Sequence, residues 1–496
     1  MVDLAKTAFS RVFLIKGRAT PEHAPQYQSC MRAASVEQNF GDVQRVECPS
    51  SDEYGQFEEI GSIQGAIERA TSSLIGRYAA DIASELLRLA RQRCAVDVQV
   101  HFGKCTDPRK FNTFTKALIW EDVALTSYGT EDLGALSSDE NAPVGETSNI
   151  SIGRFYEVLP LTLQQRASAT VTNALVDAVV CDLRTCGECG MFSDGCYKAF
   201  VLQGGITGSP GTAPDVIYTG DKGAVWNSDE ITTLDNIQTA NGIACLSDYV
   251  VVVSNSGSLH YKLKSSILAG TFGSWVEKAT GFQVPGGEPN DIWSVGIGAF
   301  IVGDGGYVYY CTDPAEGVAV LDGGEATANN LYAVHALSST AAIAVGASDT
   351  VVYTINGTSW AAANATGAGT DLTGCWMRTA TEWWVTTANG HLYYTLDSGT
   401  TWTEKTLPGV SITKLEDVQF VTDSVGYVAG TANAIGALWR TYDAGYSWVR
   451  LPEGAGSLPG NATLFSALAG CIHDPNYIIA AGGDITSDGV LLVGED

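Results

Sequence analysis

Positive charge is scarce in this chain of 496 residues, which has 28 Lys and Arg residues against 55 Asp and Glu residues and a formal net charge of −27. A surface of this sign repels phosphates, so we expect no grip on nucleic acids or anionic membranes. The deficit is largest after residue 198, where 9 basic residues face 29 acidic ones.

Long apolar runs are also missing. A membrane-spanning helix needs about 20 predominantly apolar residues, and the sequence contains no such segment. Near the N-terminus only residues 12–15 form an apolar stretch. That length predicts a strand rather than a signal-peptide core of about 7–15 residues. We therefore expect neither membrane insertion nor a secretion signal.

An internal repeat is the clearest feature that the sequence does contain. Three segments share the pattern Thr-x-Asp-x-Gly-x-x-Trp, and a fourth has a shortened copy. Asp and Gly favour a tight turn, because Asp accepts hydrogen bonds from nearby amides and Gly adopts positive φ. We expect each Trp to pack between neighbouring units. The positions that define these turns are Thr219, Asp221, Gly223, Trp226, Asn356, Gly357, Trp360, Asp397, Gly399, Trp402, Asp443, Gly445 and Trp448.

The spacing of the repeats indicates the architecture. Asp313, Asn356, Asp397 and Asp443 lie 43, 41 and 46 residues apart, with apolar stretches for about four strands per unit. Such a period is typical of β-propeller blades. We count seven units, with six as the fallback and a solenoid as the alternative fold. The first unit is short of its opening strand and the last lacks its final strand, which favours a ring closed by shared strands.

With these turns, residues 199–496 resemble the Asp-box (BNR-type) β-propellers, especially the photosystem II assembly factor-like group. The resemblance implies that the box is a structural turn and does not specify a function. Many such propellers are sialidases, which need three convergent arginines. After residue 198 the only arginines are Arg378, Arg440 and Arg450, and the last two flank a single turn. We therefore expect no catalytic residue, and a glycosidase is the least favoured function.

Residues 1–180 predict a β-sandwich or small barrel with one helix. The expected helix spans Ala79–Arg93, where Ile82, Leu86 and Leu89 recur at helical spacing. The expected strands are residues 11–15, 43–47, 56–63, 96–102, 117–126 and 150–159.

A segment without clear periodicity, residues 129–148, has no Lys or Arg. It predicts a long loop that is either an exposed connection or a segment ordered against a partner. Its acidic residues are Glu131, Asp132, Asp139, Glu140 and Glu146.

This combination of strands, one helix and a long loop resembles the tail-tube (major tail) proteins of tailed bacteriophages. The resemblance implies hexameric rings that stack into a tube, with the acidic loop bridging the rings. DNA would then pass through an acidic channel without specific binding. A capsid decoration protein is an alternative.

Four closely spaced cysteines mark the junction at residues 181–198. Cys181, Cys186, Cys189 and Cys196 follow the spacing C-x4-C-x2-C-x6-C. Four thiolates could hold a structural Zn²⁺, or the residues could form disulfides or remain free thiols, and the spacing leaves all three open. No other cofactor is expected.

Together these features favour a non-catalytic virion structural protein, a phage tail-tube protein assembled in the host cytoplasm. Its partners would be further copies of itself, other virion proteins and, through an outward propeller used in adhesion, a cell-surface ligand. The alternative is a propeller that acts as a binding or assembly module for a glycan or a protein.

Overall fold

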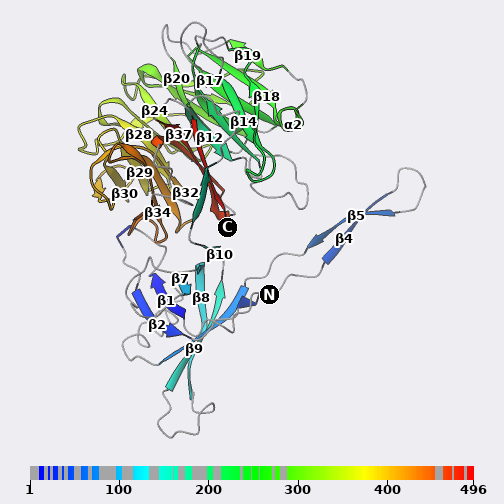
Figure 1. Cartoon of the computed structure of the whole chain (residues 1–496), viewed down its shortest axis with the longest axis vertical. Coiled ribbons are helices and arrows are strands. Elements are labelled where there is room, and N and C mark those ends of the chain that lie inside the picture. Colours follow the sequence, from blue (N-terminus) through cyan, green and yellow to red (C-terminus); the bar gives the residue numbers. More distant parts are fainter. Residues whose placement is uncertain are drawn as a thin grey trace. The chain divides into compact units, whose positions relative to one another are not determined.

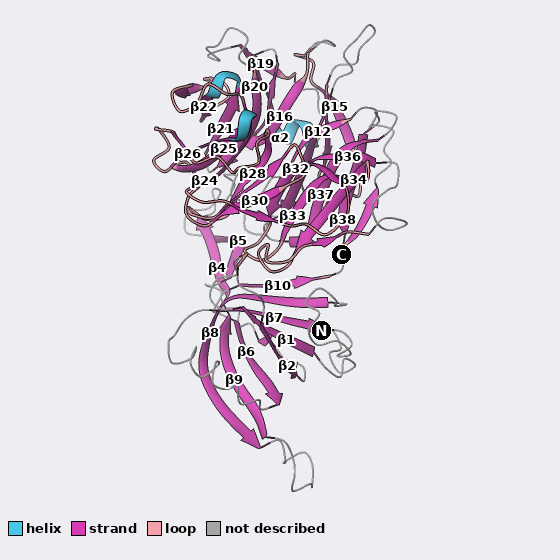
Figure 2. Cartoon of the chain, turned by 90° about the vertical axis from the view of Figure 1, so that its left-hand side faces the viewer, coloured by secondary structure: helices cyan, strands magenta, loops and turns pink. Residues whose placement is uncertain are grey.

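The computed structural model describes residues 10–15, 21–22, 26–31, 36–37, 43–49, 57–64, 70–77, 96–102, 116–132, 144–152, 154–159, 161–165, 174–180, 198–204, 214–234, 238–246, 248–255, 257–270, 274–279, 288–295, 297–452, 462–471, 474–484 and 489–495. The described chain is mainly β, as predicted (Figure 2). It divides into two compact units, the first mostly residues 1–160 and the second mostly residues 161–496.

The first unit contains an eight-stranded antiparallel sheet in the order β2-β1-β7-β8-β9-β6-β3, with β10 paired to β8, and a separate β4–β5 pair. Strands were expected at or near β1, β4, β5, β7 and β8. The expected helix, Ala79–Arg93, lies outside the described residues. The strands are β1 (Ser10–Ile15), β2 (Gln26–Met31), β3 (Val36–Glu37), β4 (Val43–Pro49), β5 (Phe57–Gln64), β6 (Ala70–Arg77), β7 (Val96–Phe102), β8 (Lys116–Asp132), β9 (Val144–Ile152) and β10 (Arg154–Val158).

The prediction of a long acidic loop at residues 129–148 is wrong at both ends of that segment, where the structure has paired strands. Strand β8 continues to Asp132 and β9 begins at Val144, with Glu131 paired to Gly145 and Thr130 to Glu146. The sequence hid these strands because their residues are polar on both faces and show no alternation of apolar and polar positions. Asp139 and Glu140 lie outside the described residues.

The second unit contains seven four-stranded antiparallel sheets, which confirms the seven-bladed propeller (Figure 1). We number the blades in chain order by their innermost strands. Blade 1 consists of β12 (Leu175–Val180), β13 (Ala199–Gln203), β14 (Asp215–Thr219) and β15 (Asn227–Glu230). Blade 2 consists of β16 (Ala240–Leu246), β17 (Tyr249–Ser254), β18 (Ser258–Leu263) and β19 (Val276–Ala279). Blade 3 consists of β20 (Pro289–Val295), β21 (Gly298–Gly303), β22 (Tyr307–Cys311) and β23 (Ala319–Gly323).

Blades 4 to 7 follow the same meander. Blade 4 has β24 (Leu331–Ser338), β25 (Ala341–Gly346), β26 (Thr350–Thr354) and β27 (Ala361–Ala362), and blade 5 has β28 (Leu372–Met377), β29 (Trp383–Thr387), β30 (Leu392–Thr395) and β31 (Thr403–Lys405). Blade 6 has β32 (Ile412–Phe420), β33 (Gly426–Ala432), β34 (Ile435–Thr441) and β35 (Val449–Arg450). Blade 7 has β36 (Ala462–Cys471), β37 (Asp474–Asp484) and β38 (Gly489–Glu495), together with β11 (Thr162–Gln165).

Ring closure depends on two strands that precede residue 199. Strand β11 pairs with the C-terminal strand β38, with Leu163 opposite Gly494, and so completes blade 7. Strand β12 supplies the innermost strand of blade 1. The propeller strands therefore begin within residues 1–180, earlier than the boundary that the repeats indicated, because β11 and β12 lie far from any Asp-box.

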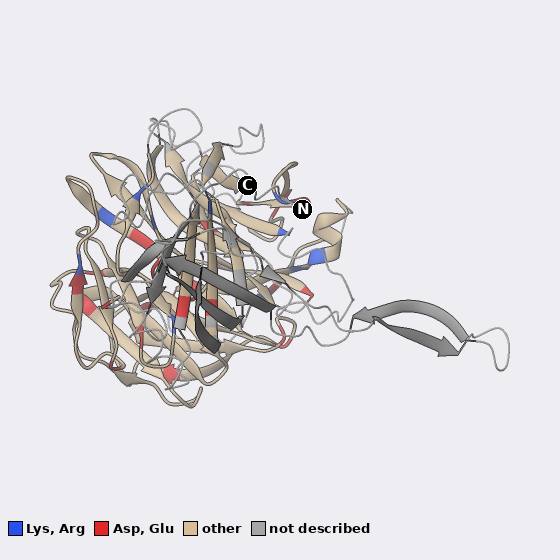
Figure 3. Ribbon diagram, turned by 90° about the horizontal axis from the view of Figure 1, so that it is seen from below, with Lys and Arg blue, Asp and Glu red and all other residues tan. Residues whose placement is uncertain are grey.

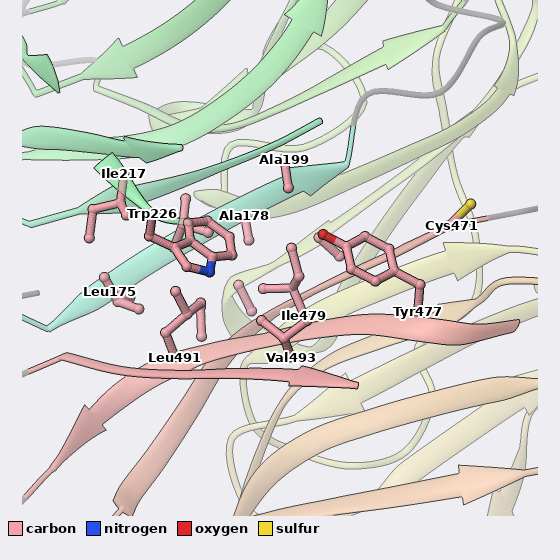
Figure 4. Close-up of a cluster of buried hydrophobic side chains, with 14 residues drawn as sticks. Leu175, Ala178, Ala199, Ile217, Trp226, Cys471, Tyr477, Ile479, Leu491 and Val493 are labelled. Carbon is pink, nitrogen blue, oxygen red and sulfur yellow. The ribbon is translucent and has the colours of Figure 1, made fainter. Parts of the chain in front are cut away.

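The core of the propeller lies between the blades rather than in one centre. Each blade packs both faces against its neighbours, so its middle strands are nearly continuous apolar runs, such as Tyr249–Ser254. Between blades 7 and 1, Trp226 lies among Leu175, Ile217, Leu491 and Val493 (Figure 4). This packing joins the two ends of the propeller.

One short helix, α2 (Lys264–Leu268), follows β18. Within the part of the chain that the structure describes, no helix has the length and apolar character needed to cross a bilayer.

Candidate functional site

The Asp-box turns lie between the third and fourth strands of their blades. In the turn of blade 5, Thr395 Oγ1 donates a hydrogen bond to Asp397 Oδ1 at 2.7 Å, and the Thr401 amide donates to the same oxygen at 2.8 Å. Gly399 has φ +77°, and a Cβ there would lie 2.7 Å from the Cβ of Ala363. The turn therefore requires both its acceptor and its glycine.

The other three copies use their acidic or amide group in the same way. Asp221 Oδ1 accepts from Thr219 Oγ1 at 2.7 Å. Asn356 Oδ1 accepts from the amides of residues 358 and 359 at 3.0 and 2.8 Å. Asp443 accepts from the amide and hydroxyl of Ser447 at 2.8 and 2.6 Å. Each group thus stabilises its own turn.

Electrostatics agree with this structural role. The hydrogen bonds from the Thr401 amide and hydroxyl lower the pKa of Asp397 to about 2. A carboxylate held in its ionised form by its own turn is poorly suited to donate a proton at neutral pH.

The four Asp-box tryptophans lie where their blade meets the preceding one. Trp226 and Trp448 are buried, whereas Trp360 and Trp402 are half-buried. The indole of Trp402 also donates to the Asn364 carbonyl at 2.9 Å. The packing role expected from the sequence therefore holds for all four, with burial complete for only two.

The three arginines of the propeller lie at separate places: Arg378 follows β28, Arg440 lies in β34 and Arg450 lies in β35. Arg378 forms an ion pair with Glu382 at 3.1 Å, with both side chains buried. Arg440 donates to the carbonyl of Pro475 at 3.0 Å, and Arg450 lies on β35. Arg378 is thus engaged within blade 5, and Arg440 is engaged between blades 6 and 7.

Three aromatic rings meet on consecutive innermost strands. The His335 ring lies 4.6 Å from Trp293 and 3.7 Å from Trp376, measured between centroids. His335 Nδ1 accepts from the Met377 amide at 3.0 Å, and burial lowers the pKa of this imidazole to about 3. The imidazole is therefore neutral, while both indoles are half-buried.

Three exposed aliphatic side chains lie at the same end of blades 3 and 4. Ile297 precedes β21 and is 79% exposed, Leu337 is the second-last residue of β24 and is 42% exposed, and Ile355 in the Asp-box turn is 73% exposed. In an antiparallel meander the first and third turns of a blade share one end, so these residues lie at the end that carries the Asp-boxes. We call them the aliphatic rim.

Sequence inspection missed the aliphatic rim. Its signal was available, because Ile297 stands between two glycines and Ile355 occupies a turn position where a polar residue is usual.

The proposed metal or disulfide cluster, Cys181, Cys186, Cys189 and Cys196, lies outside the described residues. Among the residues that are described, no group of three or more His, Cys, Asp or Glu side chains could hold a metal ion. Cys245 and Cys471 each take part in a disulfide bond. Cys311 and Cys375 are free and buried.

The acidic residues expected to bridge rings are divided by the structure. Glu131 and Asp132 lie at the end of β8 and Glu146 lies in β9, so these three belong to paired strands.

Comparisons with known proteins identify the fold. No family model matches the chain, and no curated protein matches it. The solved structure of YCF48 from Cyanidioschyzon merolae is 17% identical, covers 67% of this chain and 98% of its own, and has a TM-score of 0.50. The likeness to a photosystem II assembly factor-type propeller is thus confirmed at the level of the fold.

Two other structures have similar coverage. YCF48 bound to D1 peptide is 15% identical over 68% of this chain and 96% of its own, with a TM-score of 0.49. The WD40 β-propeller domain of Doa1 is 10% identical over 67% and 97%, with a TM-score of 0.48. The resemblance of the N-terminal region to tail-tube proteins receives no support from these neighbours.

Proposed function

We propose that this chain is a non-catalytic binding module whose propeller holds a partner protein at the Asp-box end of blades 3 and 4. The observation that carries the proposal is the aliphatic rim, Ile297, Leu337 and Ile355, on a rigid ring. This is the binding-module alternative from the sequence, and it replaces the tail tube as the preferred function.

The energetics of the aliphatic rim favour a protein partner. Full burial of one aliphatic side chain contributes about 1.5–3 kcal/mol, and contiguous exposed apolar residues often mark interaction sites. Charged positions are scattered over the described ribbon, most of which carries neither sign (Figure 3). We therefore expect a partner that presents apolar side chains to the aliphatic rim.

The frame suits binding because its Asp-box carboxylates and two of its arginines are already engaged within the propeller. The Asp-box carboxylates accept bonds within their own turns, and Arg378 and Arg440 have buried local partners. A preformed surface on such a frame costs little conformational entropy when a partner binds. The same occupation supports a function without catalysis.

The test compares aliphatic-rim variants with a matched control at the opposite end of the propeller. Peptides selected from a displayed library against the full chain are measured by calorimetry on Ile297→Ser, Ile355→Ser and Val410→Ser. Val410 is 67% exposed and lies between β31 and β32, at the end away from the Asp-boxes.

We expect each of the two aliphatic-rim variants to raise the dissociation constant of the peptide roughly tenfold or more. Val410→Ser should leave the dissociation constant unchanged. Equal affinities for all three variants and the parent chain, or a loss confined to Val410→Ser, would refute the proposal.

A further inference from the structure

Three aromatic side chains occupy equivalent positions on the innermost strands of blades 3, 4 and 5. The register shifts of these strands align them, and Trp293, His335 and Trp376 each lie two residues after the residue that follows the shift. We call these three side chains the aromatic arc. At the matching position the other blades carry Val179, Ala244, Gln419 and Ala469. The aromatic rings are therefore confined to one part of the propeller.

The rings of the aromatic arc form a corner. The Trp376 indole lies 3.7 Å from the His335 imidazole, measured between centroids, at an interplanar angle of 33°. Trp293 and Trp376 meet edge to face, at 5.3 Å and 83°. Indoles from blades 3 and 5 thus meet at the histidine of blade 4. All three residues lie in the second half of their strands, toward the end that carries the Asp-boxes.

The polar atoms of the aromatic arc are hydrogen-bond donors without acceptors. His335 Nδ1 accepts from the Met377 amide, so the proton of this neutral ring is on Nε2. Within the part of the chain that the structure describes, neither this N–H nor the indole N–H of Trp293 or Trp376 has an acceptor. None of the three nitrogens is fully enclosed, although His335 as a whole is only 4% exposed. Each donor is therefore open to a ligand.

The two indoles of the aromatic arc differ in this respect from the other tryptophans of the described propeller. Elsewhere the indole N–H has an acceptor, as in Trp384, which donates to Glu382, and Trp402, which donates to Asn364. Otherwise it is enclosed, as in Trp226 and Trp448. The further tryptophans with an acceptor are Trp383 and Trp439, and the further enclosed ones are Trp275 and Trp360. Packing of the propeller thus accounts for those indoles but leaves the donors of the arc open.

The charges around the aromatic arc favour a neutral acceptor over an anion. After residue 198 the chain has 29 acidic residues and 9 basic ones. Asp291 lies two residues before Trp293 in the same strand. Arg378, two residues after Trp376, is already paired with Glu382 at 3.1 Å. A carboxylate or phosphate would therefore be repelled, whereas a carbonyl oxygen would not.

A proline-rich segment supplies neutral acceptors without competing donors. An ordinary peptide brings one amide N–H for each carbonyl, and an amide N–H that faced the donors of the arc would be left unpaired. Proline has a carbonyl but no N–H. Proline-rich segments also dock on aromatic side chains, and their preformed polyproline II helix loses little conformational entropy on binding.

We propose that the aromatic arc binds a proline-rich segment of the partner protein, with prolyl rings packed on the indoles of Trp293 and Trp376. Backbone carbonyls of the segment accept from the two indole N–H groups and from His335 Nε2. This inference rests on the proposed function, in which the Asp-box end of blades 3 and 4 holds a partner. Ile297 follows Trp293 by four residues and Leu337 follows His335 by two, so the aliphatic rim and the arc belong to the same two blades.

The first test needs no variant to bind. Decaproline is titrated onto the full chain labelled with 15N in its tryptophans, and the indole N–H signals are followed by NMR. We expect the signals of Trp293 and Trp376 to shift and that of Trp402 to stay, since its N–H already donates to the Asn364 carbonyl. A Gly-Ser peptide of the same length, which has an amide N–H for every carbonyl, should shift none of them. No shift with decaproline, or equal shifts with both peptides, would overturn the proposal.

The second test repeats the titration on Trp293→Phe and Trp376→Phe, followed through the indole that remains. Each variant keeps an aromatic ring and removes one N–H, so we expect the dissociation constant of decaproline to rise about threefold to tenfold, as for the loss of one hydrogen bond. Trp402→Phe is the matched control and should bind as the parent chain does. Unchanged affinity in both arc variants, or an equal rise in Trp402→Phe, would refute the role of these donors.

The peptides selected from the displayed library separate this proposal from the proposed function. If they lose affinity in Ile297→Ser while decaproline shifts no signal of the aromatic arc, the proposed function stands and the proline-rich partner is wrong. If decaproline shifts the arc signals while the selected peptides bind Ile297→Ser and Ile355→Ser as tightly as the parent chain, the arc stands as a proline site and the aliphatic rim is wrong.

Discussion

At the scale of single residues, the tryptophans of the Asp-boxes differ in how much they stabilise the ring. Trp448 is 6% exposed and packs with Trp384 and Phe420, whose ring centroids lie 5.9 and 6.0 Å away. Trp402 is half-buried and 6.5 Å from Trp383. The sequence pattern made these residues equivalent, because it records the turn and not the depth of the blade contact around it.

We therefore expect Trp448→Ala to lower the free energy of unfolding by about 3–5 kcal/mol, as for other buried aromatic truncations. Trp402→Ala should cost clearly less, because part of its ring already faces water. Urea unfolding of the two variants measures the difference. Equal losses would mean that exposure of the ring does not govern its contribution.

Two sets of residues that the ring brings into line could not be predicted from the sequence. The set formed by Asp177, Asp291 and Asp417 on the innermost strands was not recognised, because the blades between them carry small residues at that position and only the strand register aligns the three. The aliphatic rim was missed because its members come from different turns. Both sets are defined by the ring and not by local pattern.

At the scale of elements, hairpins with an Asp-box were predictable and strands without one were not. The box sets a turn between apolar strands, so its period indicated the blades. Strand β11 is only four residues long and pairs with a strand more than 300 residues away. Strands β8 and β9 extend into polar sequence, where the alternation that marks a strand is absent.

Strand β11 gives a matched pair of variants. Leu163 is 2% exposed whereas Gln164 is exposed, although both pair with β38. We expect Leu163→Ser to speed hydrogen exchange of the β38 amides, because the anchoring contact is lost, and to leave β25 in blade 4 unchanged. Gln164→Ser should alter neither strand. Similar exchange in both variants would indicate that blade 7 does not depend on the side chain of Leu163.

At the scale of the whole molecule, the second unit is a ring whose two sequence ends meet in blades 7 and 1. Each blade buries both faces, so the loss of one strand exposes apolar residues of its neighbours as well. The composition predicted an acidic chain, and the repeats predicted its β-strands and its ring. The start of the ring could not be read, because its first two strands lie on the other side of the cysteine-rich junction.

The most direct test of a ring closed by upstream strands compares two chains, residues 161–496 and residues 199–496, by thermal unfolding followed with circular dichroism. We predict one cooperative transition for the longer chain, since it retains β11 and β12. The shorter chain should lack that transition, because blade 7 loses its outer strand and blade 1 its innermost strand. Equally cooperative unfolding of both chains would contradict closure by β11 and β12.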